Sequence, residues 1–288
     1  MHSNRVLFPA ASIIAALVSS SIGATVAKST FPIIGAEGMT ALRVGFSAMI
    51  LWLITRPWRT RTSMMMGAKL TAYGVALALM NIMIFQAFAR LPIGIATAIE
   101  VLGPISVALA GSRRKLDFLW VLLAIFGLII LLPLRQESTL DPIGLLLAAG
   151  AAFCWGIYIV LGQKVAPIGA GRAVSLGMMV AALIAVPFGL FNSSPSNYSW
   201  AIIGLGLVVA VISSTIPYLL EMMAFGRLPQ KLVGLLLSGA PAIAAAVAAI
   251  LLGETLTPTQ WIAVTLIIAA SAGCALSSAP VKAYADPV

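Results

Sequence analysis

The sequence predicts an all-α membrane protein in which ten transmembrane helices form two inverted five-helix repeats, with both termini on the cytoplasmic side. Its composition, its long apolar segments and its uneven distribution of Lys and Arg lead to this prediction. Hydrophobic residues make up 61% of the 288 positions and charged residues 9%, whereas a soluble domain carries about 25% charged residues. The outer surface must therefore face lipid, where only helices and closed barrels satisfy the backbone. Unbroken apolar runs exclude barrel strands, which alternate over about ten residues.

Ten segments are long enough to cross a bilayer, which takes about 20 apolar residues in a helix. The first follows Arg5, and a secretory signal peptide is the alternative for this region. Its apolar run continues for the length of a full span, so we expect a helix that stays in the mature chain. The predicted helices cover residues 7–27, 38–55, 69–89, 93–111, 117–134, 142–163, 172–191, 199–220, 231–252 and 258–277.

The Lys and Arg residues fall mostly on one side of this topology. Thirteen lie on the side of the N-terminus, only Lys28, Arg90 and Arg135 lie on the other, and Arg43 lies within a span. Cytoplasmic loops of membrane proteins are rich in Lys and Arg, so both termini are predicted to be cytoplasmic. The same rule explains the net charge of +9 without a nucleic-acid partner. Cys154 and Cys274 lie in apolar runs with no metal-ligand spacing, so we expect no metal and no cofactor.

The two halves of the chain carry a repeated motif. FARLP at 88–92 matches FGRLP at 225–229, and a proline, Pro104 or Pro241, follows fourteen residues after each arginine. A repeat of five helices is odd-numbered, so the second copy must enter the membrane in the opposite orientation. The predicted units are 1–137 for the first repeat, 138–279 for the second and 280–288 for a cytoplasmic tail.

Inverted repeats around a site at the membrane midplane are typical of secondary transporters, which open alternately to the two sides. Pro104 and Pro241 free backbone carbonyls and permit kinks, so we expect them to act as hinges. No connection is long enough to hold an ATPase, so a gradient would have to drive transport. His2 is the single histidine, and hydrolase and metalloprotease motifs are absent. We therefore do not expect an enzyme.

Short motifs in consistent order resemble the drug/metabolite transporter superfamily of the EamA type, and within it the bacterial inner-membrane exporters of threonine and homoserine. The resemblance implies ten helices in two repeats and export of a small amino acid. One position departs from the pattern: where the superfamily often has Glu before the proline of the ninth helix, this chain has Ala240. The matching stretches are AKS (27–29), TALR (40–43), MN (80–81), PIGIA (92–96), Glu100, GP (103–104), SRR (112–114), CWGIY (154–158), PY (217–218), EM (221–222), RLP (227–229) and LGETLT (252–257).

Two charged residues are predicted to lie deep in the membrane. Glu100 lies eight residues beyond Pro92, and Arg43 lies five residues into the second predicted helix. Both helices enter from the same side, so their depths differ by a few ångströms. An ionisable side chain at the bilayer centre costs about 2.5–3.5 kcal/mol, which favours a functional role. We expect Glu100 to exchange a proton; the alternative is a structural ion pair with Arg43.

Further candidates follow from the chemistry of an amino acid, which presents a carboxylate and an ammonium group. Arg43 or Lys28 would bind the carboxylate, and Glu100 would bind the ammonium; Lys28 is equally well explained as a snorkelling end residue. Glu221 is a further candidate for binding the substrate or a proton; the alternative is an interfacial residue that meets Arg227. The other residues predicted to line the cavity are Asn81, Trp155, Tyr158 and Tyr218.

Together these features predict a proton-coupled exporter of small amino acids in the bacterial inner membrane, working by alternating access as a monomer or a homodimer. Its expected partners are the substrate, protons and the lipid bilayer. The same-fold alternative is an exporter of another cargo, such as a drug or a purine-related metabolite. The alternative of a different class is a membrane-embedded enzyme or receptor, which the missing motifs and soluble domains disfavour.

Overall fold

The computed structural model describes residues 4–59, 63–91, 93–111, 115–131 and 141–252, together with 258–259, 261–263, 265–266 and 269–270. Every regular element in these residues is helical. The elements in chain order are α1 (Asn4–Ser29), α2 (Phe31–Thr55), η1 (Pro57–Arg59), α3 (Met64–Arg90), α4 (Ile93–Glu100), α5 (Leu102–Ala110), α6 (Lys115–Leu131), α7 (Pro142–Val165), η2 (Ala166–Ile168), α8 (Ala170–Phe191), η3 (Pro195–Asn197), α9 (Trp200–Ala210), the π-helical turn η4 (Val211–Thr215), α10 (Ile216–Phe225), α11 (Gln230–Leu237) and α12 (Ala240–Leu252).

Within the described residues, seven helical segments are long and apolar enough to cross a membrane. These seven segments correspond to the first, second, third, fourth, sixth, seventh and eighth predicted helices. Shorter apolar helices, Phe118–Gly127 and Gln230–Ala244, lie where the fifth and ninth were predicted. The tenth predicted helix, 258–277, and the tail, 280–288, lie outside the continuously described residues. The all-helical membrane fold is therefore confirmed, and the full count of ten stays a prediction.

The second predicted helix begins earlier than expected, at Phe31 instead of residue 38. A proline in the first turn starts the helix, and Gly35 (φ 77°, ψ 164°) then interrupts it with a kink. Only glycine adopts this conformation readily, and the break hid the first turn from the sequence pattern. Arg43 consequently lies in the middle of α2 and not near its start.

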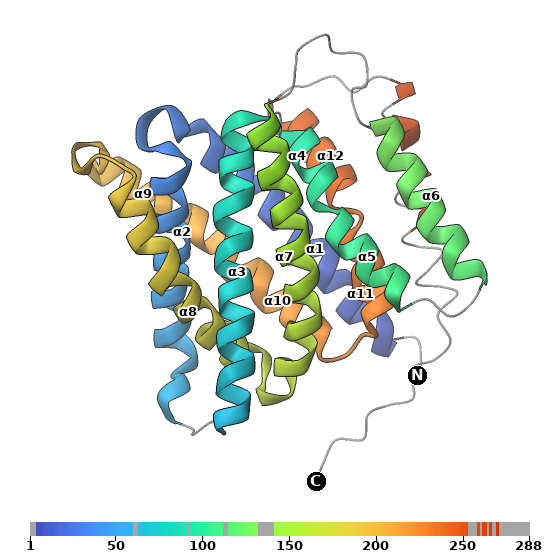
Figure 1. The fold of residues 1–288 in the computed structure, drawn as a ribbon, viewed down its shortest axis with the longest axis horizontal. Helices are drawn as coiled ribbons and strands as arrows, with labels where there is room; N and C mark the ends of the chain where they lie inside the picture. Colours follow the sequence, from blue (N-terminus) through green and yellow to red (C-terminus); the bar gives the residue numbers. More distant parts are fainter. Residues whose placement is uncertain are drawn as a thin grey trace.

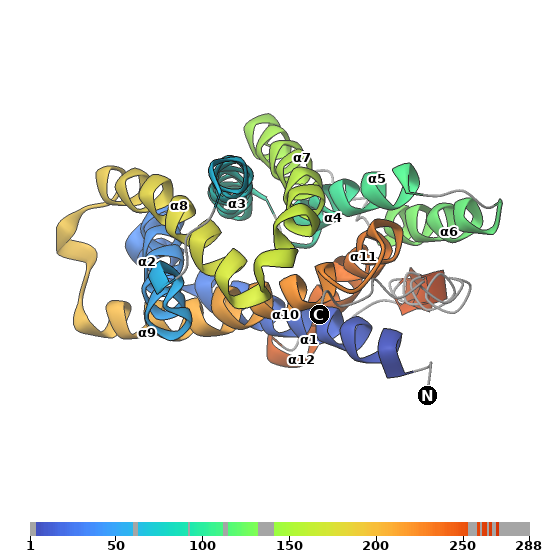
Figure 2. The same ribbon diagram turned by 90° about the horizontal axis from the view of Figure 1, so that it is seen from below.

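The helices surround a buried core to which both halves of the chain contribute. Figure 1 shows α2, α3 and α7 running nearly alongside one another, with α6 at the edge of the bundle. Seen from below in Figure 2, α3 and α7 lie on one flank and α1, α9 and α10 on the other. α3 packs on α7 and α8, α2 packs on α8 and α9, and α1 packs on α10. Helices from the two halves are thus each other's main neighbours.

The fourth and ninth predicted helices are each broken in the middle. α4 ends at Glu100 and α5 begins at Leu102, and α11 ends at Leu237 before α12 begins at Ala240. Pro104 has no N–H to bond the carbonyl of Glu100 four residues earlier, and Pro241 leaves the carbonyl of Leu237 unbonded in the same way. The predicted proline discontinuities are present, and the role of Pro104 and Pro241 as hinges stays a prediction.

Candidate functional site

A π-helical turn joins α9 to α10 and presents polar groups inside an otherwise apolar segment. The Ile216 N–H bonds to the carbonyl of Val211, five residues earlier. The next donor in this pattern would be Pro217, which has no N–H. The carbonyl of Ile212 is instead bonded by the hydroxyl of Ser19 on α1, at 2.6 Å. Single π turns occur often at functional sites, so this turn marks the region for attention.

Helix α1 passes very close to this turn at Gly23. A Cβ atom on Gly23 would lie 2.3 Å from the Cβ of Ser213, well inside van der Waals contact. Only a glycine allows α1 to approach so closely, so α1 packs directly against η4 at Ser213. The Ser213 hydroxyl bonds Arg43 of α2.

The guanidinium group of Arg43 lies at the centre of the site, with 5% of the residue exposed. One terminal nitrogen donates to the hydroxyl of Ser213 at 3.0 Å, and the other donates to the side-chain oxygen of Asn81. The guanidinium carbon lies 4.1 Å from the ring centre of Phe85, a cation–π contact. The Nε–H has no partner in the described part of the chain. A buried donor without an acceptor is costly, so this group is ready to bind one.

Asn81 and Tyr218 meet beside Arg43 from equivalent places in the two halves. The Tyr218 hydroxyl donates to the Asn81 oxygen at 3.0 Å, while the Asn81 nitrogen donates to the carbonyl of Leu77 at 2.7 Å. Each residue lies nine positions before the arginine of its repeated motif. The site therefore lies where matching segments of the two halves come together.

Two carboxylic acids lie near this arginine. Glu100, the last residue of α4, is buried and within electrostatic range of Arg43 and Glu221. No direct ion pair joins Arg43 to Glu100 among the residues that the structure places, and the proton-exchanging role of Glu100 stays a prediction. Glu221 is also buried and accepts a hydrogen bond from the hydroxyl of Tyr158 at 2.9 Å. The alternative of an interfacial Glu221 meeting Arg227 does not fit this arrangement, because Arg227 is exposed and Glu221 is buried; the binding role of Glu221 stays a prediction.

Aromatic rings surround the Glu221 carboxylate. The ring of Tyr158 lies 5.2 Å from that of Tyr73, 5.8 Å from that of Tyr218 and 5.4 Å from that of Phe225, measured between centres. Tyr218 belongs to this group and also bonds Asn81, so it joins the arginine and the carboxylate. We call Arg43, Ser47, Asn81, Glu100, Tyr158, Ser213, Thr215, Tyr218 and Glu221 the central polar cluster.

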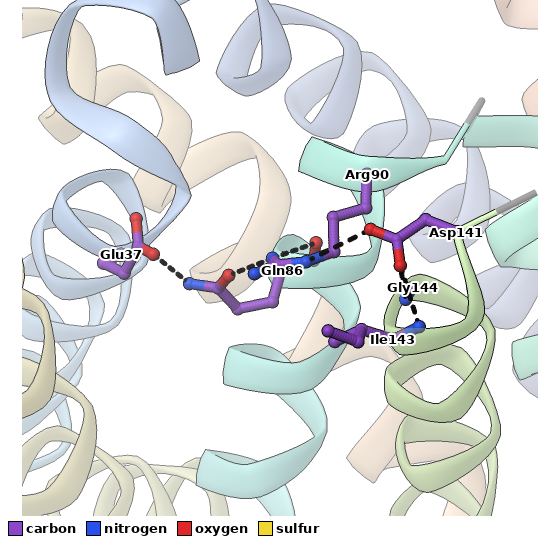
Figure 3. Close-up of polar contacts among 6 residues, drawn as sticks. All are labelled: Glu37, Gln86, Arg90, Asp141, Ile143 and Gly144. Carbon is purple, nitrogen blue, oxygen red and sulfur yellow. Dashed lines mark hydrogen bonds and ion pairs between the residues drawn. The ribbon is translucent and has the colours of Figure 1, made fainter.

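A second polar network lies at the end of the bundle where α3 ends and α7 begins. Figure 3 shows its chain of contacts, from Glu37 through Gln86 and Arg90 to Asp141. The Gln86 amide nitrogen donates to Glu37, and Arg90 donates to the Gln86 oxygen at 2.8 Å. Arg90 Nε lies 3.6 Å from an Asp141 carboxylate oxygen, and both side chains are 37% exposed. We call these four residues the end network.

Asp141 has a second role as the cap of α7. Its carboxylate accepts from the backbone N–H of Ile143 at 2.8 Å and of Gly144 at 3.4 Å (Figure 3). These donors would otherwise lack partners in the first turn. One carboxylate thus begins α7 and ties it to α3.

The structure brings most of the predicted site residues together but separates two of them. Arg43, Asn81 and Tyr218 are in direct contact, and Tyr158 and Glu221 form a neighbouring pair. Lys28 lies at the end of α1, where its Nζ donates to the carbonyl of Leu91 at 3.2 Å. Trp155 packs in the apolar core. Neither is among the direct contacts of Arg43.

The prediction missed the hydroxyl residues of the cluster, Ser47, Ser213 and Thr215. A signal was present: SST at 213–215 stands in an apolar segment two residues before Pro217. Consecutive hydroxyls next to a helix-disrupting proline indicate a break with polar side chains available. Ser47, one turn beyond Arg43, gave no comparable signal.

A separate hollow of about 440 Å³ lies between α2 and α8. Its lining is apolar and includes Met49, Trp52, Leu183 and Pro187. Several of these side chains are exposed on the bundle surface. The hollow offers no polar recognition, so the central polar cluster remains the candidate site for a polar molecule.

Comparison with known proteins places this architecture in a family. Residues 142–276 match the model of the EamA-like transporter family. The chain is 45% identical to the threonine/homoserine exporter RhtA of Escherichia coli (strain K12) over 273 residues, covering 94% of this chain and 92% of the relative. The chain belongs to the EamA-like transporter family. The threonine/homoserine exporter RhtA of Salmonella typhimurium (strain LT2) is 44% identical over the same lengths.

Membership of the EamA-like family confirms the resemblance seen in the sequence motifs. The protein is a transporter and not an enzyme, and it is a multi-pass protein of the bacterial inner membrane. A solved structure, titled only as the crystal structure of a protein, matches with a TM-score of 0.74 and 21% identity, over 95% of this chain and 97% of that one. At that identity the likeness supports the fold alone.

Proposed function

We propose that this EamA-like transporter exports small amino acids, threonine and homoserine among them, across the inner membrane. The relatives named as threonine/homoserine exporters align with nearly the whole chain. The observation that carries the proposal is the buried guanidinium of Arg43, whose Nε–H lacks an acceptor in the described residues. A substrate carboxylate supplies such an acceptor, and arginine binds carboxylates through paired, charge-assisted hydrogen bonds.

The ammonium group of the same substrate fits the acidic side of the cluster. Glu100 lies within electrostatic range of Arg43, so one zwitterion placed between them pairs both charges. Tyr158 and Tyr218 add aromatic faces and hydroxyls near Glu221, where a cation is also stabilised. Buried charges are tolerated in proteins when they are paired in this way.

The charges of the cluster also support proton coupling. Arg43 contributes one positive charge and Glu100 and Glu221 two acidic groups, so full ionisation would leave an unpaired negative charge in a buried site. One proton removes it. The substrate is a zwitterion with no net charge, but its ammonium group needs an ionised carboxylate as its partner. Because proton and substrate then compete for the same carboxylates, loading one releases the other. Exchange of external protons for internal amino acid follows from that competition.

The packing of the helices supports two inverted repeats, 1–137 and 138–279. The repeated motif pairs α2 with α8, α3 with α9 and α10, α4 with α11, and α5 with α12. If each helix is replaced by its counterpart, the contact between α5 and α11 becomes a contact between α12 and α4, which is also observed. In the same way, the contact between α3 and α8 becomes the observed contact between α9 and α2. The breaks after Glu100 and Leu237 also correspond. We infer a twofold relation with its axis near Asn81 and Tyr218.

The distribution of basic residues supports an orientation with both termini inside. The turns from α2 to α3, α7 to α8 and α10 to α11 lie at one end of the bundle, and those from α1 to α2, α3 to α4 and α8 to α9 lie at the other (Figure 1). Lys28 and Arg90 belong to the second end. The first end, which we assign to the cytoplasm, carries Arg56, Arg59, Lys164, Arg172, Arg227 and Lys231.

In this orientation the end network lies on the outer side and joins α2 and α3 of the first half to α7 of the second. These contacts favour a state in which the outer side is held together, while Pro104 and Pro241 lie at the helix breaks around which the halves would move. Alternating access then requires the end network to separate during each cycle.

Proteoliposomes containing the full chain test the proposal. Labelled threonine or homoserine should cross in response to a pH gradient, and no flux of any amino acid would defeat it. A flux of purine-related metabolites or drugs without amino acids would favour the other cargo class. Glu100→Gln should retain the fold but lose most of the dependence on the pH gradient; an unchanged dependence would make Glu100 structural.

A further inference from the structure

We propose that Ser47 and Thr215 recognise the side-chain hydroxyl of the substrate, so that this transporter selects hydroxylated amino acids over isosteres that lack the hydroxyl. The inference rests on the proposed amino-acid export and names a specificity site within the same cluster. It assigns a distinct role to two residues that do not touch Arg43 directly.

Ser47 and Thr215 form an isolated hydroxyl pair in the interior. The Thr215 hydroxyl donates to the Ser47 oxygen at 3.0 Å. Both residues are buried: Thr215 is 5% exposed and Ser47 is 0% exposed. Ser47 accepts this bond and, among the contacts of the described residues, donates none. A hydroxyl can donate once and accept twice, so the pair keeps both a donor and acceptor positions for a ligand.

Several other hydroxyls in the membrane segments behave differently. Those of Ser12, Thr25, Thr40, Thr55 and Ser106 each donate to the carbonyl four residues earlier in their own helix. This local bond is the usual way to satisfy a hydroxyl in an apolar helix. Ser47 and Thr215 bond across helices instead, and the neighbouring Ser214 hydroxyl is buried without a partner in the structure as described. Ser47, Ser214 and Thr215 thus place unused hydroxyl capacity at this turn; among the serines of the described residues, Ser175 on α8 is the other one buried without a partner.

The pair lies at a suitable distance from the carboxylate site. Arg43 and Ser47 are one helical turn apart on α2, a rise of about 5.4–6 Å, and their partners Ser213 and Thr215 are two residues apart on η4. A substrate whose carboxylate bonds Arg43 has its side chain within about one turn of the hydroxyl pair. Threonine carries its hydroxyl on Cβ and homoserine on Cγ, and both positions fall within this reach.

The π-helical turn η4 supplies both contacts to α2. Ser213 and Thr215 lie two positions apart on this turn, and they bond Arg43 and Ser47, which lie one turn apart on α2. The turn thus aligns a charge contact and a hydroxyl contact along one helix face.

The test compares isosteric substrate pairs in proteoliposomes of the full chain. Threonine is paired with valine and homoserine with norvaline, each differing by a hydroxyl in place of a methyl group. The measured quantity is the ratio of concentrations at which each member competes with labelled threonine. In the unmodified protein the hydroxylated member should compete at about tenfold lower concentration, the ratio that one net hydrogen bond supports.

Ser47→Ala and Thr215→Val should each bring this ratio close to one. Thr215→Ser, which keeps the hydroxyl, should retain most of it. Thr40→Val is the matched control, because Thr40 is buried on α2 one turn before Arg43 and bonds its own helix; it should leave the ratio unchanged.

Two results would overturn the inference without affecting the proposed function. One is threonine flux in the unmodified protein with no preference for either hydroxylated member. The other is an unchanged ratio in the variants that still transport. If Ser47→Ala or Thr215→Val fails to assemble, the ratio in the other of these two variants decides. Absence of flux for every amino acid would instead refute the export function itself.

Discussion

The central polar cluster and the end network are both built from a few polar side chains between helices, yet their arginines differ in burial and in hydrogen bonding. In the end network, Arg90 is 37% exposed and bonds both Gln86 and Asp141. In the central polar cluster, Arg43 is buried and keeps an unpartnered Nε–H within the described chain. The exposed arginine has its acceptors, and the buried one lacks an acceptor for one donor.

This is the difference that we expect between a contact that holds helices together and the proposed ligand site. A half-exposed ion pair is screened by water and contributes about 0–1 kcal/mol, so it is suited to form and break repeatedly. A buried donor without an acceptor costs about 1–3 kcal/mol, and that cost is relieved when a ligand bonds it. The two regions therefore predict different responses to the same kind of substitution.

The largest expected effect is that of Arg43→Gln. Losing a charge-assisted contact to the substrate carboxylate costs about 1.5–3 kcal/mol, which corresponds to roughly a ten- to hundredfold lower affinity for threonine. Arg43→Lys should fall between, because lysine keeps the charge but lacks the planar fork. Competition with labelled threonine in proteoliposomes measures both.

Arg90→Gln is the matched control for that experiment, since it removes an arginine from the end network. It should leave the affinity for threonine within about threefold and change the transport rate instead. Equal losses of affinity in the two variants would remove the proposed distinction between the regions.

The next effect concerns the hydroxyl that holds Glu221. Tyr158→Phe removes the 2.9 Å bond to a buried carboxylate, which should lower the free energy of unfolding by about 1.5–3 kcal/mol. Tyr198→Phe is the control: its hydroxyl contacts that of Ser193 in the half-buried connection before α9. In a Glu221→Gln background the loss from Tyr158→Phe should shrink, because a neutral acceptor bonds less strongly. Equal losses in both backgrounds would contradict the assigned contact.

The sequence predicted the helices well and their polar contacts only in part. Apolar length identifies a span, so the positions of the long helices followed from the apolar runs along the sequence. Asn81 and Tyr218 could be linked through the repeated motif, since each lies nine positions before its arginine. The kink at Gly35 and the inward direction of Glu221 could not be predicted from the sequence, because both depend on packing between distant segments. Ser47 was missed because a serine in a span usually bonds its own helix.

A smaller effect is expected from Asp141, whose two roles can be separated. Asp141→Ala removes both the cap of α7 and the contact with Arg90, and should lower the free energy of unfolding by about 1–2 kcal/mol. Asp141→Asn keeps a good capping residue and removes the charge, so the loss should stay below about 1 kcal/mol. Chemical denaturation of the purified protein measures both values. If Asp141→Asn were as damaging as Asp141→Ala, the ion pair and not the cap would govern this end of α7.

The smallest effect should come from Glu37→Gln, and it sharpens the comparison because this acid lies on the same helix as Arg43. Glu37 is partly exposed and accepts one hydrogen bond from Gln86. A glutamine of the same shape still presents a carbonyl oxygen to that donor, so the free energy of unfolding should change by about 0.5 kcal/mol or less. Affinity for threonine should not change, because the substitution lies at the end of the bundle and leaves every contact of Arg43 in place. A loss of affinity comparable to that of Arg43→Gln would mean that the two polar regions form one continuous site, with the substrate passing from Arg43 along α2 to the end network.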